Sequence, residues 1–96
     1  MGDLKVEVDG SQVTLNGEIS YKTVVSALKV KIFSANEPVS VDFAGVGHAD
    51  SAGLALMVHW VREAKKRDVA VDFRNIPKKL IALAEMSNLE EVLPIS

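Results

Sequence analysis

The sequence contains no cysteine, so neither a disulfide framework nor a thiolate metal site is available to it. It also has no run of about 18 apolar residues of the kind that spans a membrane. The first residues, from Met1 to Lys5, include an acid and lead into no apolar block, so they do not resemble a signal peptide. The net charge of -2 provides no electrostatic footprint for nucleic acid or anionic membranes. These absences predict a cytoplasmic protein that reaches a membrane only through a partner.

What is present is an ordinary globular composition. Of the 96 residues, 48% are hydrophobic and 25% are charged, and such values are typical of globular domains. A chain of this length buries roughly 60–70% of the surface that its unfolded form exposes, which is enough for a hydrophobic core. No repeat, low-complexity tract or linker divides the sequence. We therefore expect one domain over residues 1–96.

The chain begins with a predicted β-hairpin. Apolar and polar residues alternate over residues 4–8, which is the pattern of a half-buried strand. Asp9-Gly10 predicts a two-residue turn, and a second strand follows over residues 13–17.

Helices and strands then alternate. The predicted elements are a helix over residues 21–34, a strand over 39–43, a loop over 44–49, a helix over 51–67, a strand over 69–73 and a helix opened by Pro77. Ser20 is a suitable cap for the first helix. The apolar stripe of that helix is expected to be Tyr21, Val24, Val25, Leu28 and Ile32. A last turn that packs on the core is predicted from Leu89, Val92 and Leu93.

The predicted order is therefore β-β-α-β-α-β-α. Each strand-helix-strand passage predicts a right-handed crossover between parallel strands. Together with the N-terminal hairpin, this order gives an α/β fold with a mixed four-stranded sheet and three to four packed helices.

The helix over residues 51–67 has more apolar surface than one contact with a sheet requires. On a helical wheel, one narrow sector contains Leu54, Val58, Val61 and Lys65. Leu56 lies nearly opposite this sector, and Trp60 lies well away from it. One interpretation is that Trp60 packs under the third helix and Leu56 is an isolated surface residue. The other is that the two side chains form an exposed patch that binds another protein.

The segment Asp50-Ser51-Ala52-Gly53 follows a strand and opens this helix. Backbone N–H groups and the helix dipole favour an anion at such a position. Asp50 is expected to cap the helix with its carboxylate. The Ser51 hydroxyl can either contact a partner or accept a phosphate.

Catalytic, metal and nucleotide roles are disfavoured by spacing. The G-x-S-x-G pattern of a nucleophilic serine is absent around Ser51, and no histidine is positioned to activate it. His48, Asp50 and His59 do not have the spacing of a metal site. The glycines of the preceding loop form neither a P-loop nor G-x-G-x-x-G. We therefore expect no enzyme activity, no cofactor and no metal.

Five segments of the chain together resemble the STAS domain family. They are LNGEI (residues 15–19), VDF (41–43), DSAGLAL (50–56), NIPKKL (75–80) and MSNL (86–89). The resemblance runs from about Leu15 to Ile95, and the DSAGL segment is its most specific element. It implies a STAS-like fold and a role in protein docking, as in anti-sigma-factor antagonists and the cytoplasmic ends of sulfate-type anion transporters.

Other details resemble the small stand-alone subunits of Mla-type phospholipid-transport ABC complexes of Gram-negative bacteria. They are GLAL (residues 53–56), His59, AKK (64–66), Leu83-Ala84 and Val92-Leu93-Pro94. This resemblance implies a non-catalytic subunit that binds and supports the ATPase subunit of a complex maintaining outer-membrane lipid asymmetry. The residue that matches Ser51 then belongs to the docking surface.

The resemblance also leaves an alternative. In anti-sigma-factor antagonists the serine that matches Ser51 is phosphorylated by a partner kinase, which switches partner binding off. One departure from the family concerns Ser20, since an acid is common at that position; we interpret Ser20 as a replacement helix cap. Under either function the predicted partner-binding site comprises His48, Asp50, Ser51, Ala52, Leu56 and Trp60.

Overall fold

The computed structural model describes residues 3–33, 36–89 and 93–94. Its elements are β1 (Leu4–Asp9), β2 (Gln12–Ile19), α1 (Tyr21–Leu28), β3 (Val39–Ala49), α2 (Ala52–Lys66), β4 (Val71–Arg74) and α3 (Lys78–Met86). The predicted order of strands and helices is confirmed. Among the described residues, no helix is both long and apolar enough to cross a membrane.

The four strands form one mixed sheet in the order β1-β2-β3-β4. Strands β1 and β2 are antiparallel, whereas β3 is parallel to both β2 and β4. The hairpin loop is Gly10-Ser11, one residue later than predicted, because Asp9 still pairs with Gln12. Gly10 adopts a φ of 60°, which glycine tolerates without steric cost.

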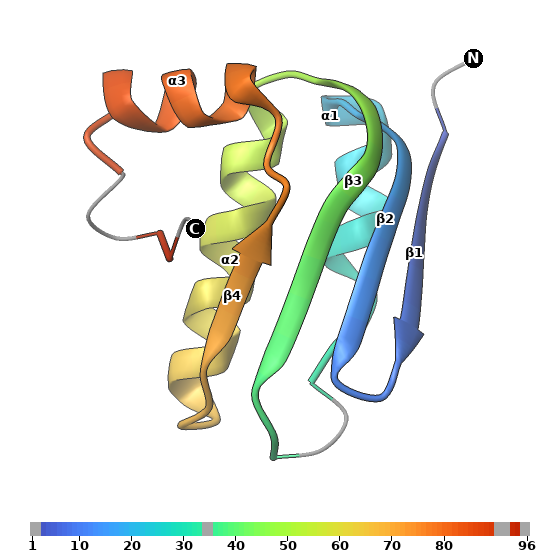
Figure 1. Cartoon of the computed structure of the whole chain (residues 1–96), viewed down its shortest axis with the longest axis vertical. Coiled ribbons are helices and arrows are strands. Elements are labelled where there is room, and N and C mark those ends of the chain that lie inside the picture. Colours follow the sequence, from blue (N-terminus) through green and yellow to red (C-terminus); the bar gives the residue numbers. More distant parts are fainter. Residues whose placement is uncertain (1–2, 34–35, 90–92, 95–96) are drawn as a thin grey trace.

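Helices α1 and α2 both cover the same face of the sheet (Figure 1). This arrangement follows from two successive crossovers that advance in the same direction along the sheet. The inward residues of β2 are Val13, Leu15 and Ile19, and the alternate residues, such as Thr14 and Asn16, are exposed on the opposite face. The molecule is therefore a two-layer α/β structure with a polar open sheet face.

Ser20 caps α1 as predicted. Its hydroxyl accepts a hydrogen bond from the Lys22 N–H at 3.2 Å, and Thr23 Oγ1 accepts one from the Ser20 N–H at 2.9 Å. The helix ends at Leu28, earlier than the predicted end at residue 34, which itself lies outside the described residues. The β-branched residues that follow continue as irregular chain, and Ile32 is buried there.

Strand β3 is longer than predicted. The segment over residues 44–49, expected to be a loop with two glycines, continues the strand to Ala49. The pairing with β2 shifts register twice, between Thr14 and Asn16 and again between Gly17 and Glu18. In each case β3 contains one extra residue, as in a β-bulge. Bulges accommodate the glycines that otherwise predict a loop.

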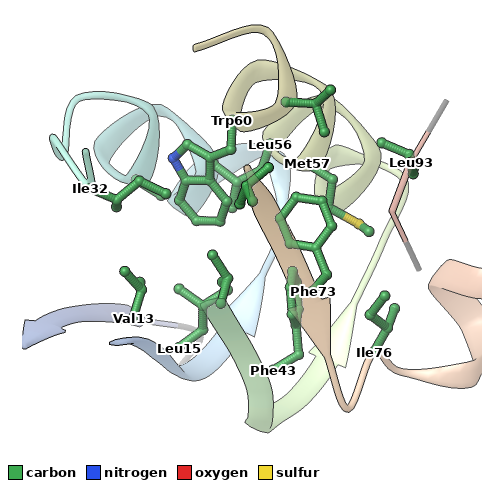
Figure 2. Close-up of a cluster of buried hydrophobic side chains, with 14 of the residues drawn as sticks. Val13, Leu15, Ile32, Phe43, Leu56, Met57, Trp60, Phe73, Ile76 and Leu93 are labelled. Atoms are coloured by element: carbon green, nitrogen blue, oxygen red, sulfur yellow. The ribbon is translucent and has the colours of Figure 1, made fainter. Parts of the chain in front are cut away.

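The core lies between the sheet and α2. Its largest side chains include Trp60 of α2, Phe43 of β3 and Phe73 of β4. The two phenylalanine rings pack edge to face, with centroids 5.9 Å apart and an interplanar angle of 83°, which is a favourable arrangement of aromatic quadrupoles. Figure 2 shows Leu56, Met57 and Trp60 above the strand side chains.

Strand β4 and helix α3 complete the fold. Strand β4 begins at Val71, two residues later than predicted, and Pro77 immediately precedes α3 rather than opening it. The predicted last turn is confirmed in part, because Leu93 is buried and its N–H donates to the Leu89 carbonyl at 2.9 Å. Val92 lies outside the described residues.

Asp42 connects β3 to the turn that precedes α3. Its Oδ1 accepts hydrogen bonds from the Asn75 side-chain amide at 2.9 Å and from the Ala44 N–H at 2.8 Å. The Asn75 bond, followed by the Ala44 bond and the charge of Arg74, lowers the pKa of Asp42 below its ordinary value of 3.8.

We predict opposite responses to alanine at two glycines of β3. A Cβ at Gly45 would lie 2.7 Å from the Leu15 carbonyl oxygen and would also collide with the Asn16 side chain, whereas a Cβ at Gly47 meets nothing within 4 Å. We expect Gly45→Ala to lower the free energy of unfolding by about 1–3 kcal/mol through overpacking. Gly47→Ala is the matched control and should be neutral or stabilising by up to about 1 kcal/mol. Urea denaturation measures both, and equal losses in the two variants would contradict the steric explanation.

A second prediction concerns acid stability. Asn75→Gly removes the largest cause of the Asp42 shift and still tolerates the positive backbone angle at this position (φ 55°). The pKa of Asp42 should rise toward 3.8, and by a larger amount than in Arg74→Gln. Because the folded pKa lies below the unfolded one, the contribution of Asp42 is full above the unfolded pKa and is lost as the pH falls through the folded pKa. Carbon-detected NMR titration of the carboxyl measures the shift, and a larger rise in Arg74→Gln would refute the assignment.

Candidate functional site

Three helices begin at one edge of the sheet. The parallel strands β2, β3 and β4 end at this edge, and α1, α2 and α3 follow them in turn (Figure 1). The Asp50 N–H donates to the Ile19 carbonyl at 3.0 Å and so connects the end of β3 to the end of β2. The N-terminal N–H groups of α1 and α2 therefore lie near each other, and their dipoles favour negative charge here.

Asp50 caps α2, as predicted. Its Oδ1 accepts a hydrogen bond from the Ala52 N–H at 2.8 Å, and its carbonyl accepts one from the Gly53 N–H at 3.0 Å. Gly53 in turn packs on α3, because a Cβ there would lie 2.8 Å from both terminal methyl groups of Leu80. The start of α2 is thus fixed by a cap and by contact with the next helix.

Ser51 has no comparable structural role. Its backbone is already helical, with φ -61° and ψ -15°, and its side chain makes no capping hydrogen bond. The residue is exposed. A hydroxyl that neither caps the helix nor packs in the core is available to a partner or to a modifying enzyme.

His48 and Ala52 lie beside these two residues. His48 is exposed near the end of β3, opposite Glu18 of β2, and Ala52 is partly exposed in the first turn of α2. We refer to His48, Asp50, Ser51 and Ala52 as the Ser51 edge. Four of the six predicted site residues are therefore brought together by the structure.

The predicted exposure of Leu56 and Trp60 is wrong. Leu56 is 0% exposed and Trp60 is 1% exposed. Both side chains point into the layer between α2 and the sheet (Figure 2). Trp60 does not pack under the third helix either, since it lies near Ile32 in the segment that follows α1. Neither side chain forms part of a surface patch.

The error arose from the choice of the inward face of α2. The buried residues of this helix are Gly53, Leu54, Leu56, Met57, Trp60, Val61 and Ala64. At about 100° per residue their centre lies roughly a quarter of a turn from the predicted sector, which included Lys65. The small residues Gly53 and Ala64 lie near the centre of the buried face of α2, where neighbouring elements approach closely.

The structure exposes a different apolar pair, Tyr21 and Val25 of α1, which the sequence pattern did not indicate. Both were expected in the core, yet Tyr21 is 71% exposed and Val25 is 53% exposed. The two residues lie one turn apart on α1. Tyr21 is also close to the Ser51 edge in the chain, because it comes two residues after Ile19, whose carbonyl accepts the Asp50 N–H. The buried residues of α1 are instead Val24 and Ala27. The signal in the sequence was Ala27, which continues the stripe of Val24 at a spacing of three residues.

Metal binding at the Ser51 edge has no support from the described residues. Within residues 3–33, 36–89 and 93–94, no group of three His, Asp or Glu side chains could hold a metal ion. His48 and His59 are separated, because His48 lies on β3 and His59 is half-buried midway along α2.

The β-β-α-β-α-β-α order, with an exposed serine at the start of the central helix, defines a STAS-type domain. A family model described as "Mlab, STAS domain" matches residues 3–94. The chain therefore belongs to the STAS domain family.

Within the family, the chain is similar to two proteins named MlaB. The chain is 28% identical over 86 residues to the intermembrane phospholipid transport system binding protein MlaB of Escherichia coli (strain K12), and the match covers 88% of this chain and 89% of that protein. MlaB of Shigella flexneri matches with the same identity and coverage.

Solved structures support the fold. The unphosphorylated anti-sigma factor antagonist SpoIIAA superimposes with a TM-score of 0.71 at 19% identity, covering 97% of this chain and 85% of that one. An anti-sigma factor antagonist from Mycobacterium paratuberculosis gives a TM-score of 0.66 at 19% identity, with coverages of 96% and 82%. The predicted STAS-like fold is thus confirmed.

We predict that the two neighbouring residues at the start of α2 differ in their effect on stability. Asp50→Ala should lower the free energy of unfolding by about 0.5–2 kcal/mol, because the Ala52 N–H loses its acceptor. Ser51→Ala should change it by less than about 0.5 kcal/mol, since its side chain caps nothing. Guanidinium denaturation of both variants checks the difference. A loss in Ser51→Ala as large as that in Asp50→Ala would mean that the hydroxyl has a structural role.

Proposed function

We propose that this protein is a non-catalytic, cytoplasmic subunit that binds and supports the ATPase of a phospholipid-transport ABC complex. The observation that carries the proposal is the exposed Ser51 hydroxyl, which has no capping role, in a STAS domain whose named relatives are MlaB proteins. Through such a complex, the protein would contribute to outer-membrane lipid asymmetry and contact the membrane only indirectly.

The docking surface in this proposal is the Ser51 edge together with the Tyr21–Val25 pair. The pair takes the place of Leu56 and Trp60, whose side chains are buried. Tyrosine suits an interface because its ring gives a large contact area and its hydroxyl remains polar. Asp50 and its bond to the end of β2 hold the two parts of the surface in a fixed relation.

The test is co-purification with the ATPase subunit after co-expression. Ser51→Arg places a long cationic side chain in the middle of the surface, and retained ATPase should fall by roughly tenfold, equivalent to about 1.4 kcal/mol of binding free energy. Ser87→Arg is the matched control, since Ser87 is an exposed serine at the far end of α3. Tyr21→Ala should also reduce retention while leaving the unfolding transition almost unchanged. Wild-type retention in both Ser51→Arg and Tyr21→Ala would refute the surface.

A second candidate function is that of an anti-sigma-factor antagonist switched by phosphorylation of Ser51. The favouring observation is again the free hydroxyl, which lies where a phosphate of about two negative charges would meet the N-terminus of α2. The partner would then be an anti-sigma kinase. Incubation with ATP and such a kinase, followed by mass spectrometry, separates the functions. Stoichiometric phosphate on Ser51 favours the switch, and unlabelled protein favours the transport subunit.

A further inference from the structure

A pocket of about 200 Å³ lies between α2 and the segment that leads out of α1. Its lining includes Lys29, Lys31, Ile32, Trp60, Glu63 and Arg67. Since Trp60 follows Ser51 by nine residues, this pocket lies about 13 Å along α2 from the Ser51 edge. It is therefore separate from the Ser51 edge, although Leu28 of its lining follows Val25 of the proposed docking surface by three residues.

One wall of the pocket contains a buried hydrogen-bond donor without an acceptor. Trp60 Nε1 is shielded from water and has no hydrogen-bond partner among the described residues. It is the one buried side-chain nitrogen or oxygen in that part of the chain with this property. Figure 2 shows the indole nitrogen on the side of the ring that faces Ile32. Ile32 and Trp60 both line the pocket. Buried donors are almost always paired in folded proteins, so this one indicates an acceptor other than the described residues.

The charges around the pocket indicate that the acceptor is anionic. Lys29, Lys31 and Arg67 are exposed at its rim, and none of them forms an ion pair within the described part of the chain. Glu63 is the one acid in the lining, and His59 is half-buried beside it. Three cations against one carboxylate leave a positive rim that attracts an anion.

The remaining lining is apolar. Leu28 and Val30 are half-buried and present carbon surface to the pocket, whereas Ile32 and Phe33 in its wall are almost fully buried. A volume of this size suits a small molecule with a short carbon chain, since sites for drug-sized ligands are commonly larger, from about 300 Å³ upward.

We propose that this pocket binds a small organic anion, a carboxylate or phosphate monoester with a short alkyl chain. An anionic oxygen accepts the Trp60 N–H and is neutralised by the cationic rim, while the alkyl chain contacts the apolar lining. The nitrogen is shielded in the unliganded chain, so the side chains in front of it must move. Residues 31–33 lie outside helix and strand, so a shift there breaks no regular hydrogen-bond ladder, but it has to displace the buried side chains of Ile32 and Phe33.

The sole tryptophan of the chain gives a direct measurement. Its indole group yields a single side-chain cross-peak in a ¹⁵N–¹H spectrum, and a new hydrogen bond to an anion should move the proton downfield. We expect hexanoate and hexyl phosphate to produce a saturable shift, and hexanol, which has the same chain without the charge, to produce none that saturates.

A pair of variants tests the cationic rim. Arg67→Gln should weaken hexanoate binding by about fivefold, as expected for loss of one partly exposed charge contact. Arg62→Gln is the matched control, because Arg62 is an exposed arginine of the same helix that does not line the pocket, and its affinity should stay within about twofold of wild type.

The outcomes are distinguishable. An indole peak that does not move with either anion would overturn the proposal and assign the N–H to a water molecule. An equal response to hexanol, or equal losses in the two arginine variants, would overturn the anionic part. Sedimentation with phosphatidylcholine vesicles, with and without oleate, identifies the source. Binding to oleate vesicles that Arg67→Gln weakens points to a lipid, and a response to free hexanoate alone points to a soluble metabolite.

Discussion

The packing of α2 on the sheet is the interaction on which the rest of this structure depends. Leu56, Met57 and Trp60 place the helix against the strands, and Gly53 lets α3 approach its first turn. Both crossovers put their helices on one face, so α2 lies between α1 and the α3 side of the molecule (Figure 1). A helix held on several sides has little freedom to slide or rotate. The position of its first residue, and hence of Ser51, is set by this core.

The start of α2 shows how capping and exposure divide between neighbouring residues. Asp50 satisfies the Ala52 N–H and, through its own N–H, connects two strand ends. Because Asp50 already performs these tasks, the Ser51 hydroxyl is left without a structural partner in the helix turn. A rigid backbone favours a docking contact because little backbone entropy is lost when a partner binds. A side chain without an internal hydrogen bond can contact the partner without breaking a bond inside the protein.

Local signals in the sequence predicted the elements well, whereas long-range packing did not follow from them. The cap at Ser20, the cap at Asp50 and the alternation in β2 act within a few residues, and all are observed. The glycines of β3 suggested a loop because a bulge depends on the register of the neighbouring strand, which composition does not encode. The burial of Leu56 was missed for a related reason. A helical wheel shows only the angular positions of the residues of one helix. Which of its faces is buried depends on the packing of all the elements around that helix.

Trp60 is the point at which the sequence and the core disagree. A phenylalanine would fill most of the same space and leave no buried donor, so the indole N–H brings a desolvation penalty that packing alone does not require. Departures from agreement between local preference and core packing tend to coincide with function. Trp60 lies beside a cavity whose cationic rim residues form no ion pair with any residue that the structure describes. The proposed docking contact at Ser51 and the proposed anion pocket at Trp60 lie at different levels of the same helix, separated by nine residues.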